Sequence, residues 1–207
     1  MNHPLTLALE CTLGGLHMAL AGGPLKEAVL HTDTTPRAAD GLHTTLQALL
    51  TAHNLKLADV QRVVTTIGPG SFTGIRMGVA VGEALKLLNP AVQLIGLGTL
   101  EALAANLITY QPTNLAFTIA TDAAGQTLYT QTFHPDGTPA TEPTCVAAED
   151  FHSDHPVYCP TTCLLLPAAH YLPPFSPTTL LAMAKNPATH KPFAPLYVKP
   201  LAYKVSA

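Results

Sequence analysis

The hydrophobic positions in the first third of the chain fall into short runs that paired glycines separate. Apolar runs cover residues 5–9, 16–21 and 28–31, and glycine pairs lie at 14–15 and 22–23. Because paired glycines favour the tight turns that join antiparallel neighbours, this pattern predicts a three-stranded meander.

Helical spacing follows the meander. Thr35 and Pro36 are suited to the N-cap and the first position of a helix, and we expect about five turns up to Asn54. The apolar side of this helix is formed by Leu42, Leu46, Leu49 and Leu50. Buried strands are then predicted at 63–67 and 92–97. Each precedes a helix, the first ending near residue 89 and the second, capped by Thr99, ending near Ile108.

The order of three strands, helix, strand, helix, strand and helix predicts a mixed sheet covered by helices, which is an α/β lobe. The pattern changes after residue 110, because 14 of the 19 prolines lie beyond it. A strand pair is expected at 115–121 and 127–133, and a short helix at 176–184. We therefore expect an N-terminal lobe of residues 1–110 and a smaller C-terminal lobe of residues 111–207.

Composition narrows the functional classes. Of the 207 residues, 47% are hydrophobic and 11% are charged, and the net charge of −3 gives no basic surface for nucleic acid. No apolar run is long enough for a membrane span and no basic leader precedes one, so we expect a cytoplasmic protein. The four cysteines are expected to be reduced, and neither they nor the ten histidines have metal-ligand spacing.

The most specific segment is a glycine-rich run between a predicted strand and a predicted helix. It contains Gly68, Pro69, Gly70, Ser71, Phe72, Thr73, Gly74, Ile75 and Arg76. Such a run can present backbone N–H groups to an anion, although it matches no established phosphate-loop pattern. Alternatively it is a tight structural turn, in which Ser71 or Thr73 caps the helix and Phe72 anchors the loop by burial.

Glycines recur along one row of the following helix, at Gly74, Gly78 and Gly82. The last two together cost about 1 to 2 kcal/mol of helix stability relative to alanine. A close contact should offset that loss, either within the chain or with a partner. The spacing alone leaves both possibilities open.

The run from residue 68 to 78 resembles the Gly-Pro-Gly-Ser-Phe-Thr-Gly-Leu-Arg-Ile-Gly hallmark of the TsaB family, also called YeaZ. The resemblance extends less strictly to residues 96–104 and 195–200. It implies an α/β, actin-like (ASKHA, ribonuclease H-like) two-lobed fold with a shortened second lobe.

The resemblance also implies a function. TsaB proteins are non-catalytic scaffolds that work with the transferase TsaD and the ATPase TsaE to make threonylcarbamoyladenosine next to the anticodon of tRNAs that read A-starting codons. The expected partners are thus a TsaD-type transferase, a TsaE-type ATPase and, for the chain alone, a second copy, with tRNA met only through the complex. Neither a cofactor nor a catalytic residue is expected. The interface residues are expected to be Leu42, Leu46, Leu49, Gly74, Gly78 and Gly82.

Departures from the family pattern define the alternatives. The usual Asp-Thr-Ser after the first strand reads Glu10-Cys11-Thr12, and Asp-Ala-Arg in the second lobe reads Asp122-Ala123-Ala124. A nucleotide-binding actin-like ATPase or kinase would use Glu10 and Asp122 to hold Mg²⁺. A peptidase would need a metal triad or an activated nucleophile, and neither is visible. Arg76 is expected to anchor the loop or pair with an acid such as Glu83, and not to bind phosphate.

Overall fold

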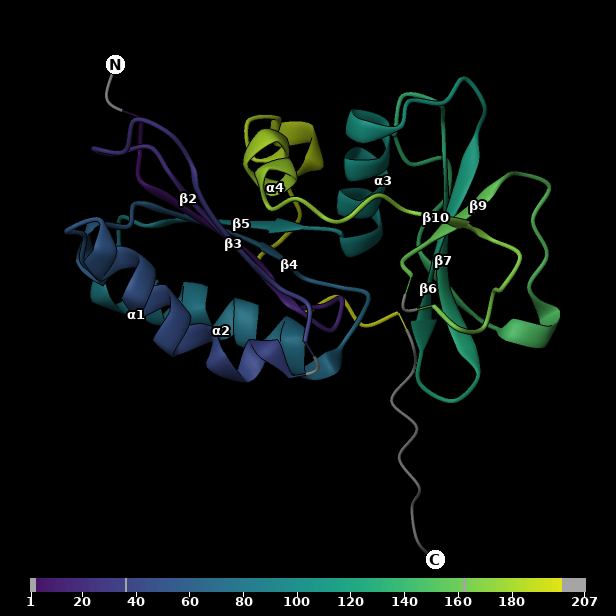
Figure 1. Cartoon of the computed structure of the whole chain (residues 1–207), viewed down its shortest axis with the longest axis horizontal. Coiled ribbons are helices and arrows are strands. Elements are labelled where there is room, and N and C mark those ends of the chain that lie inside the picture. Colours follow the sequence, from purple (N-terminus) through teal and green to yellow (C-terminus); the bar gives the residue numbers. More distant parts are fainter. Residues whose placement is uncertain (1–2, 36, 162, 199–207) are drawn as a thin grey trace, which may run out of the picture.

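The chain forms two five-stranded sheets with helices beside and between them (Figure 1). This computed structural model describes residues 3–35, 37–161 and 163–198. The strands are β1 Thr6–Glu10, β2 Leu16–Ala21, β3 Val29–Asp33, β4 Arg62–Thr66, β5 Gln93–Leu97, β6 Phe117–Ala123, β7 Thr127–Phe133, β8 Thr144–Ala147, β9 Val157–Cys159 and β10 His170–Tyr171. The α-helices are α1 Leu42–Ala52, α2 Phe72–Leu88, α3 Thr99–Tyr110 and α4 Thr178–Met183.

The first sheet has the strand order β3-β2-β1-β4-β5. The first three strands pair antiparallel, whereas β1, β4 and β5 run parallel through the crossover helices α1 and α2. The predicted meander and the α/β order of the first lobe are therefore confirmed. Among the described residues, no helix is both long and apolar enough to cross a membrane.

Alternation along β1 assigns its two faces. Leu7 and Leu9 pack with α1 and α2 in one core, while Ala8 lies in a second core with α3 and α4. Figure 1 shows the α1–α2 pair on one side of the first sheet and α4 on the other.

The second sheet has the order β10-β9-β6-β7-β8 and packs one face on α3. Phe117 and Phe133 stack at a centroid distance of 5.6 Å in that core and are fully buried. Leu100 and Leu107 of α3 join the same cluster. Helix α3 thus lies between the two halves of the molecule and contacts both.

The boundary near residue 110 falls between α3 and β6, but the chain later returns to the first lobe. Leu180 and Met183 of α4 pack in the core of the first sheet. Farther on, the amide of Lys191 donates to Gly96 O of β5 at 2.9 Å. On these contacts we assign strands β6–β10 to the second lobe, and α4 with the segment up to residue 198 to the first.

Two predicted helix starts differ from the structure. Helix α1 begins at Leu42 and has 11 residues, because Asp33 accepts hydrogen bonds from Thr35 N and Oγ1 and Arg37 takes a φ of 65°. Pro36 lies outside the described residues. Helix α3 has Gly98 at its N-cap, and the Thr99 hydroxyl bonds to Thr12 Oγ1 at 3.0 Å.

Candidate partner surface and signature loop

The glycine-rich run, here called the signature loop (residues 67–71), joins β4 to the start of α2. Two amide groups at the start of α2, those of Ser71 and Gly74, are already bonded within the chain. Ser71 N donates to Thr12 O at 2.9 Å, and Gly74 N donates to Ser71 Oγ at 3.2 Å. The predicted Ser71 cap is therefore confirmed. Because these amides have partners, they are not available for the phosphate contacts that a helix N-terminus can make.

The loop glycines are required by close approaches within the chain. Gly68 has a φ of +117° and faces the backbone carbonyl of Leu196. Gly70, at +156°, faces Thr12, and a Cβ there would lie 2.8 Å from Thr12 O. A side chain at either position would need space that the backbone of another segment occupies. Packing accounts for these two glycines, which favours the structural interpretation of the run.

The glycine row of α2 faces the chain's own interior. Gly74 meets the carbonyl of Cys11, Gly78 meets the Thr65 side chain, and Gly82 meets the ring of Phe193. All three glycines are buried. The close contact expected for this row is thus intramolecular, and these glycines are not a surface that a partner could touch in the folded monomer.

The expected leucine surface of α1 also faces inward. Leu42 and Leu46 are each 4% exposed in the first-lobe core, and Leu49 is half-buried against it. The apolar spacing correctly identified a helix but indicated its inner side. Five of the six residues expected at the interface are buried, because an apolar stripe and a glycine row are what a helix needs to pack on its own sheet.

The outward faces of α1 and α2 lie opposite these residues. Helical spacing along α2 places a set of exposed positions on one side: Thr73, Arg76, Ala80, Glu83, Ala84 and Leu87. Leu87 is 85% exposed and Leu88 is 69% exposed. On α1, Thr44 and Ala48 are exposed one turn apart. Counting helical positions away from the glycine row would have found this set in the sequence.

Phe72 does not anchor the loop by burial, since it is 46% exposed. Its ring stacks on Tyr197 at 5.2 Å between centroids, and the Arg76 guanidinium lies 5.2 Å from its centroid. Arg76 therefore makes a cation–π contact at the start of α2. The expected role of Arg76 as a loop anchor has support in this contact, while no ion pair with Glu83 occurs among the described residues.

Glu10 ends β1 and is fully buried beneath the signature loop. Its Oε1 accepts hydrogen bonds from Thr12 N, Thr12 Oγ1, Leu13 N at 3.2 Å and Thr66 Oγ1 at 3.3 Å, whereas Oε2 has no partner in the part of the chain that the structure describes. Burial raises the pKa of Glu10 to about 7, against the lowering effect of these bonds. The carboxyl group is enclosed by its own chain.

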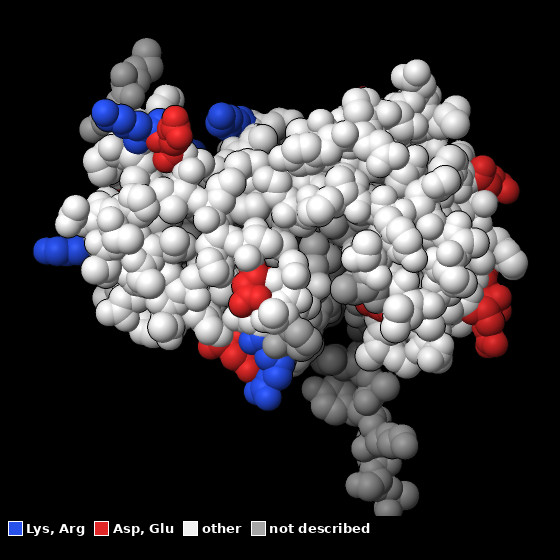
Figure 2. Space-filling view, viewed as in Figure 1, with Lys and Arg blue, Asp and Glu red and all other residues white. Residues whose placement is uncertain are grey.

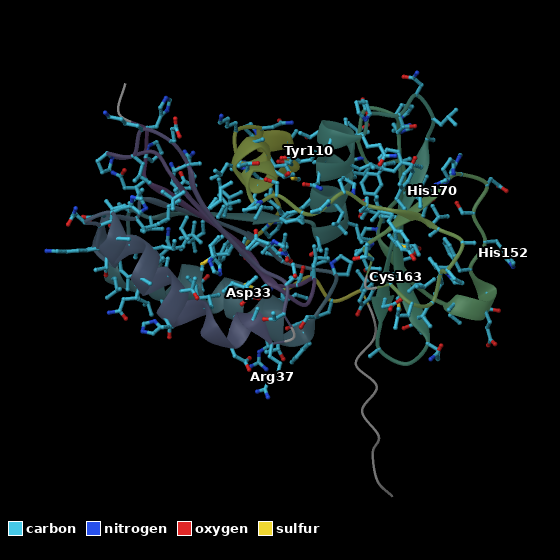
Figure 3. The ribbon with its side chains drawn as sticks, in the orientation of Figure 1. Asp33, Arg37, Tyr110, His152, Cys163 and His170 are labelled. Carbon is cyan, nitrogen blue, oxygen red and sulfur yellow. The ribbon has the colours of Figure 1, made fainter. Side chains whose placement is uncertain are left out.

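Asp122, the second carboxylate of the ATPase alternative, lies on β6 and has other partners. Its Oδ1 accepts from the Cys163 thiol at 3.0 Å, and its Oδ2 accepts from Leu164 N at 3.0 Å. Cys163 is labelled within the second lobe in Figure 3. The four cysteines are free, and within residues 3–35, 37–161 and 163–198 no group of three His, Cys, Asp or Glu side chains is arranged to hold a metal ion.

A comparison with protein families finds one match over much of the chain. The family described as TsaD, tRNA N6-adenosine threonylcarbamoyltransferase, matches residues 35–150, which is more than half of the 207 residues. The matched region contains α1, the signature loop, α2 and most of the second sheet.

Two curated relatives match shorter segments. Uncharacterized protein MG208 of Mycoplasma genitalium is 38% identical over 56 residues, covering 27% of this chain and 29% of the relative. The tRNA threonylcarbamoyladenosine biosynthesis protein TsaB of Escherichia coli is 36% identical over 59 residues, covering 28% of this chain and 25% of the relative. These alignments span less than a third of either relative.

Solved structures match nearly the whole chain. A Pseudomonas aeruginosa protein described as uncharacterized and similar to peptidase YEAZ has a TM-score of 0.72 at 19% identity, over 95% of this chain and 100% of its own. YeaZ from Pseudomonas aeruginosa has a TM-score of 0.71 at 19% identity, over 94% and 100%. At this identity the likeness establishes the fold, and the two-lobed α/β fold expected from the sequence is confirmed.

Proposed function

We propose that the chain is a non-catalytic subunit of threonylcarbamoyladenosine synthesis. It belongs to the family of the tRNA N6-adenosine threonylcarbamoyltransferase TsaD. Within that family, its signature run and its fold resemble those of TsaB (YeaZ) proteins. It binds a TsaD-type transferase and works with a TsaE-type ATPase in the cytoplasm. The transferase performs the chemistry, and this chain holds it in a competent arrangement. Without the transferase, the same surface pairs with a second copy of the chain.

The observation that carries this proposal is the uncovered outer face of α1 and α2. Both helices pack their inner sides on one face of the first sheet, as Figure 1 shows. The side chains of Ala80 and Ala84 on the outer side of α2 are small, so another helix could approach this side closely. Leu87 beside them is 85% exposed, so a partner that packed on this face would remove its apolar surface from water.

A non-catalytic role is supported by the hydrogen bonds that the carboxylates of Glu10 and Asp122 already accept within the chain. Glu10 is enclosed and bonded to its own backbone and to threonine hydroxyls, while Asp122 is bonded to Cys163 and Leu164. Glu10 is fully buried and could not reach a metal–nucleotide complex without rearrangement, whereas Asp122 is exposed and each of its oxygens already accepts one hydrogen bond. At the start of α2, where a nucleotide phosphate would bind, the amides of Ser71 and Gly74 are bonded within the chain.

The first test is a reconstituted modification reaction that contains tRNA, the TsaD-type and TsaE-type proteins and the adenylate-forming enzyme, with and without this chain. We expect modified adenosine to form only when the chain is present, and a complex with the transferase to elute as one species in size-exclusion chromatography. Normal modification without the chain would exclude the proposal.

A substitution on the outer face tests the surface itself. Ala84→Arg places a long charged side chain where we expect a helix of the transferase to pack, and should lower complex formation by roughly tenfold or more. The matched control is Ala182→Arg, which makes the same change at an exposed alanine of α4. Both variants should unfold at the same urea concentration as the parent. Equal binding by the two variants would show that the outer face of α2 is not the docking surface.

A further inference from the structure

A cavity of about 420 Å³ lies on the face of the second sheet that α3 does not cover. Its floor is formed by threonines of three neighbouring strands: Thr118 of β6, Thr130 and Thr132 of β7, and Thr144 of β8. Its wall is the segment 150–155, which contains His152, labelled at the outer edge of the second lobe in Figure 3. This place is remote in the fold from the outer face of α1 and α2.

The hydroxyl groups of the floor are held in place by one another. Thr118 Oγ1 lies 3.1 Å from Thr132 Oγ1 and 3.0 Å from Ser153 Oγ of the wall. Thr130 Oγ1 lies 3.0 Å from Thr144 Oγ1. Because a hydroxyl oxygen has two acceptor lone pairs, a hydroxyl engaged in one such pair can still accept from a ligand. The floor is thus an ordered array of oxygen acceptors.

The titratable groups of the lining are two carboxylates and two imidazoles. Asp150 and Asp154 belong to the wall together with His152 and His155, and the described residues that line the cavity include neither Lys nor Arg. Along the sequence no Lys or Arg occurs between Lys86 and Lys185, a stretch that contains the whole second sheet. In Figure 2 the second lobe, on the right, carries acidic groups and no basic ones on the visible face. Anionic ligands such as phosphates are disfavoured here.

We infer that this cavity binds an organic cation that carries primary ammonium groups, with the carboxylates of Asp150 and Asp154 and the threonine hydroxyls accepting its N–H bonds. An ammonium group has three donors and no acceptor, which is complementary to a lining rich in oxygen acceptors. The volume lies within the range of roughly 300 to 1,000 Å³ that is usual for small-molecule sites. The cation is either a free polyamine or the lysine side chains of a partner. This inference does not depend on the proposed function.

The test measures binding of spermidine to the whole chain by calorimetry at low ionic strength, with a lysine-rich peptide as the second probe. Asp150→Asn combined with Asp154→Asn should weaken binding by roughly tenfold or more, because two charge-assisted hydrogen bonds are lost. The control is Glu149→Gln, which neutralises one carboxylate beside Asp150 at a residue that does not line the cavity, and should change the affinity by less than about threefold.

Thr132→Val supplies an independent check, since it removes one floor hydroxyl and keeps the shape of the side chain. It should weaken spermidine binding without changing the net charge. Tighter binding of spermidine than of the peptide would identify a free polyamine as the ligand, and the reverse order would identify a partner's lysines. Absence of binding by both probes, equal losses for Glu149→Gln and the double variant, or tighter binding of a neutral polyol such as glucose would each overturn the inference.

Discussion

The two lobes of this chain cover their sheets differently. The first lobe packs helices on both faces of its sheet, with α1 and α2 on one side and α4 and α3 on the other. The second lobe packs α3 on one face only, and its other face is covered by segments without α-helices that contribute Phe151, Leu165 and Leu166. We therefore expect the first lobe to be the more rigid of the two, and the second has room for the cavity beside its loops.

This difference shows that a conspicuous motif need not be a binding site. The glycines of the first lobe mark places where backbone and helix approach closely, and their partners are residues of the same chain. In the second lobe, a threonine-lined face that carries no known motif forms a cavity. The most specific sequence signal reports packing, and the open polar space lies where the sequence is least distinctive.

The largest loss of folding stability should come from adding one methyl group at Gly74, where a Cβ atom would have the least space. In Gly74→Ala the new Cβ would meet the backbone carbonyl of Cys11, which cannot move without shifting β1, so we expect a loss of about 3 kcal/mol or more, or no folding. The comparison is Gly137→Ala in a turn of the second lobe. There the φ of +82° and a contact of 3.2 Å with Ile108 should cost about 1 to 2 kcal/mol.

Urea denaturation followed by circular dichroism measures both variants, with Ala80→Gly on the outer face of α2 as a control for the helix itself. That control should cost about 1 kcal/mol. If Gly74→Ala were no more destabilising than Gly137→Ala, the view that the first lobe is the tightly packed one would be wrong.

The second effect is a pH dependence that resides in the first lobe. The pKa of Glu10 is raised from 4.5 to about 7 by burial. The stability linked to its protonated form is fully present below pH 4.5 and is lost as the pH rises through about 7, which amounts to about 3 kcal/mol. In Glu10→Gln this loss should be absent, so the free energy of unfolding of the variant relative to the parent should rise by about 3 kcal/mol between pH 4.5 and 8.

Asp136 of the second lobe gives the opposite sign. Hydrogen bonds from the Thr138 side chain and then its backbone hold the pKa of Asp136 below its ordinary value, so its contribution is present above that value and is lost as the pH falls. Asp136→Asn should therefore change the acid side of the plot of unfolding free energy against pH and leave the shape of the plot above pH 5 unchanged.

The assignment to Glu10 would be contradicted if the unfolding free energies of the parent and of Glu10→Gln ran parallel from pH 4.5 to 8.

Much of the fold could be predicted from the sequence, because periodicity and turn chemistry are local. Strand β7 begins and ends where predicted, and α2 ends within one residue of the expected position. The start of α1 could not be predicted, since the Asp33–Thr35 hydrogen bonds compete with the cap that Thr35 would supply. The return of α4 to the first sheet depends on contacts distant in sequence, which no local pattern reports.

The candidate site was predicted only in part. The sequence placed the signature loop between a strand and a helix and left the cap open between Ser71 and Thr73, of which the structure shows Ser71. It could not say that Leu196 lies over Gly68 or that Phe193 lies over Gly82, because these contacts join positions more than 100 residues apart. Without knowledge of these contacts, the glycine row could equally have packed against a partner protein. The exposed positions on the opposite side of α2 were therefore not predicted as the candidate surface.

The third prediction concerns the loss of stability when a leucine is truncated to alanine in the core of each lobe. Leu128 of β7 is fully buried under the loop cover of the second sheet, and Leu46 of α1 is 4% exposed between helix and sheet. Loops relax more easily than a packed helix, so Leu128→Ala should cost about 2 kcal/mol and Leu46→Ala at least about 1 kcal/mol more. Urea denaturation measures both. A larger loss for Leu128→Ala would reverse the order of rigidity that we assign to the lobes.

The smallest effect concerns the cap at the signature loop. Ser71 Oγ accepts from Gly74 N, and Ser71→Ala leaves that amide without its partner, so the variant should lose about 1 kcal/mol. Ser71→Thr keeps a hydroxyl at the cap and is the matched control. This loss of stability should not depend on added phosphate, because Ser71 N already donates its hydrogen bond to Thr12 O and so is not available to an anion. If phosphate stabilised the parent but not Ser71→Ala, the loop would be an anion site and the structural interpretation of its glycines would fail.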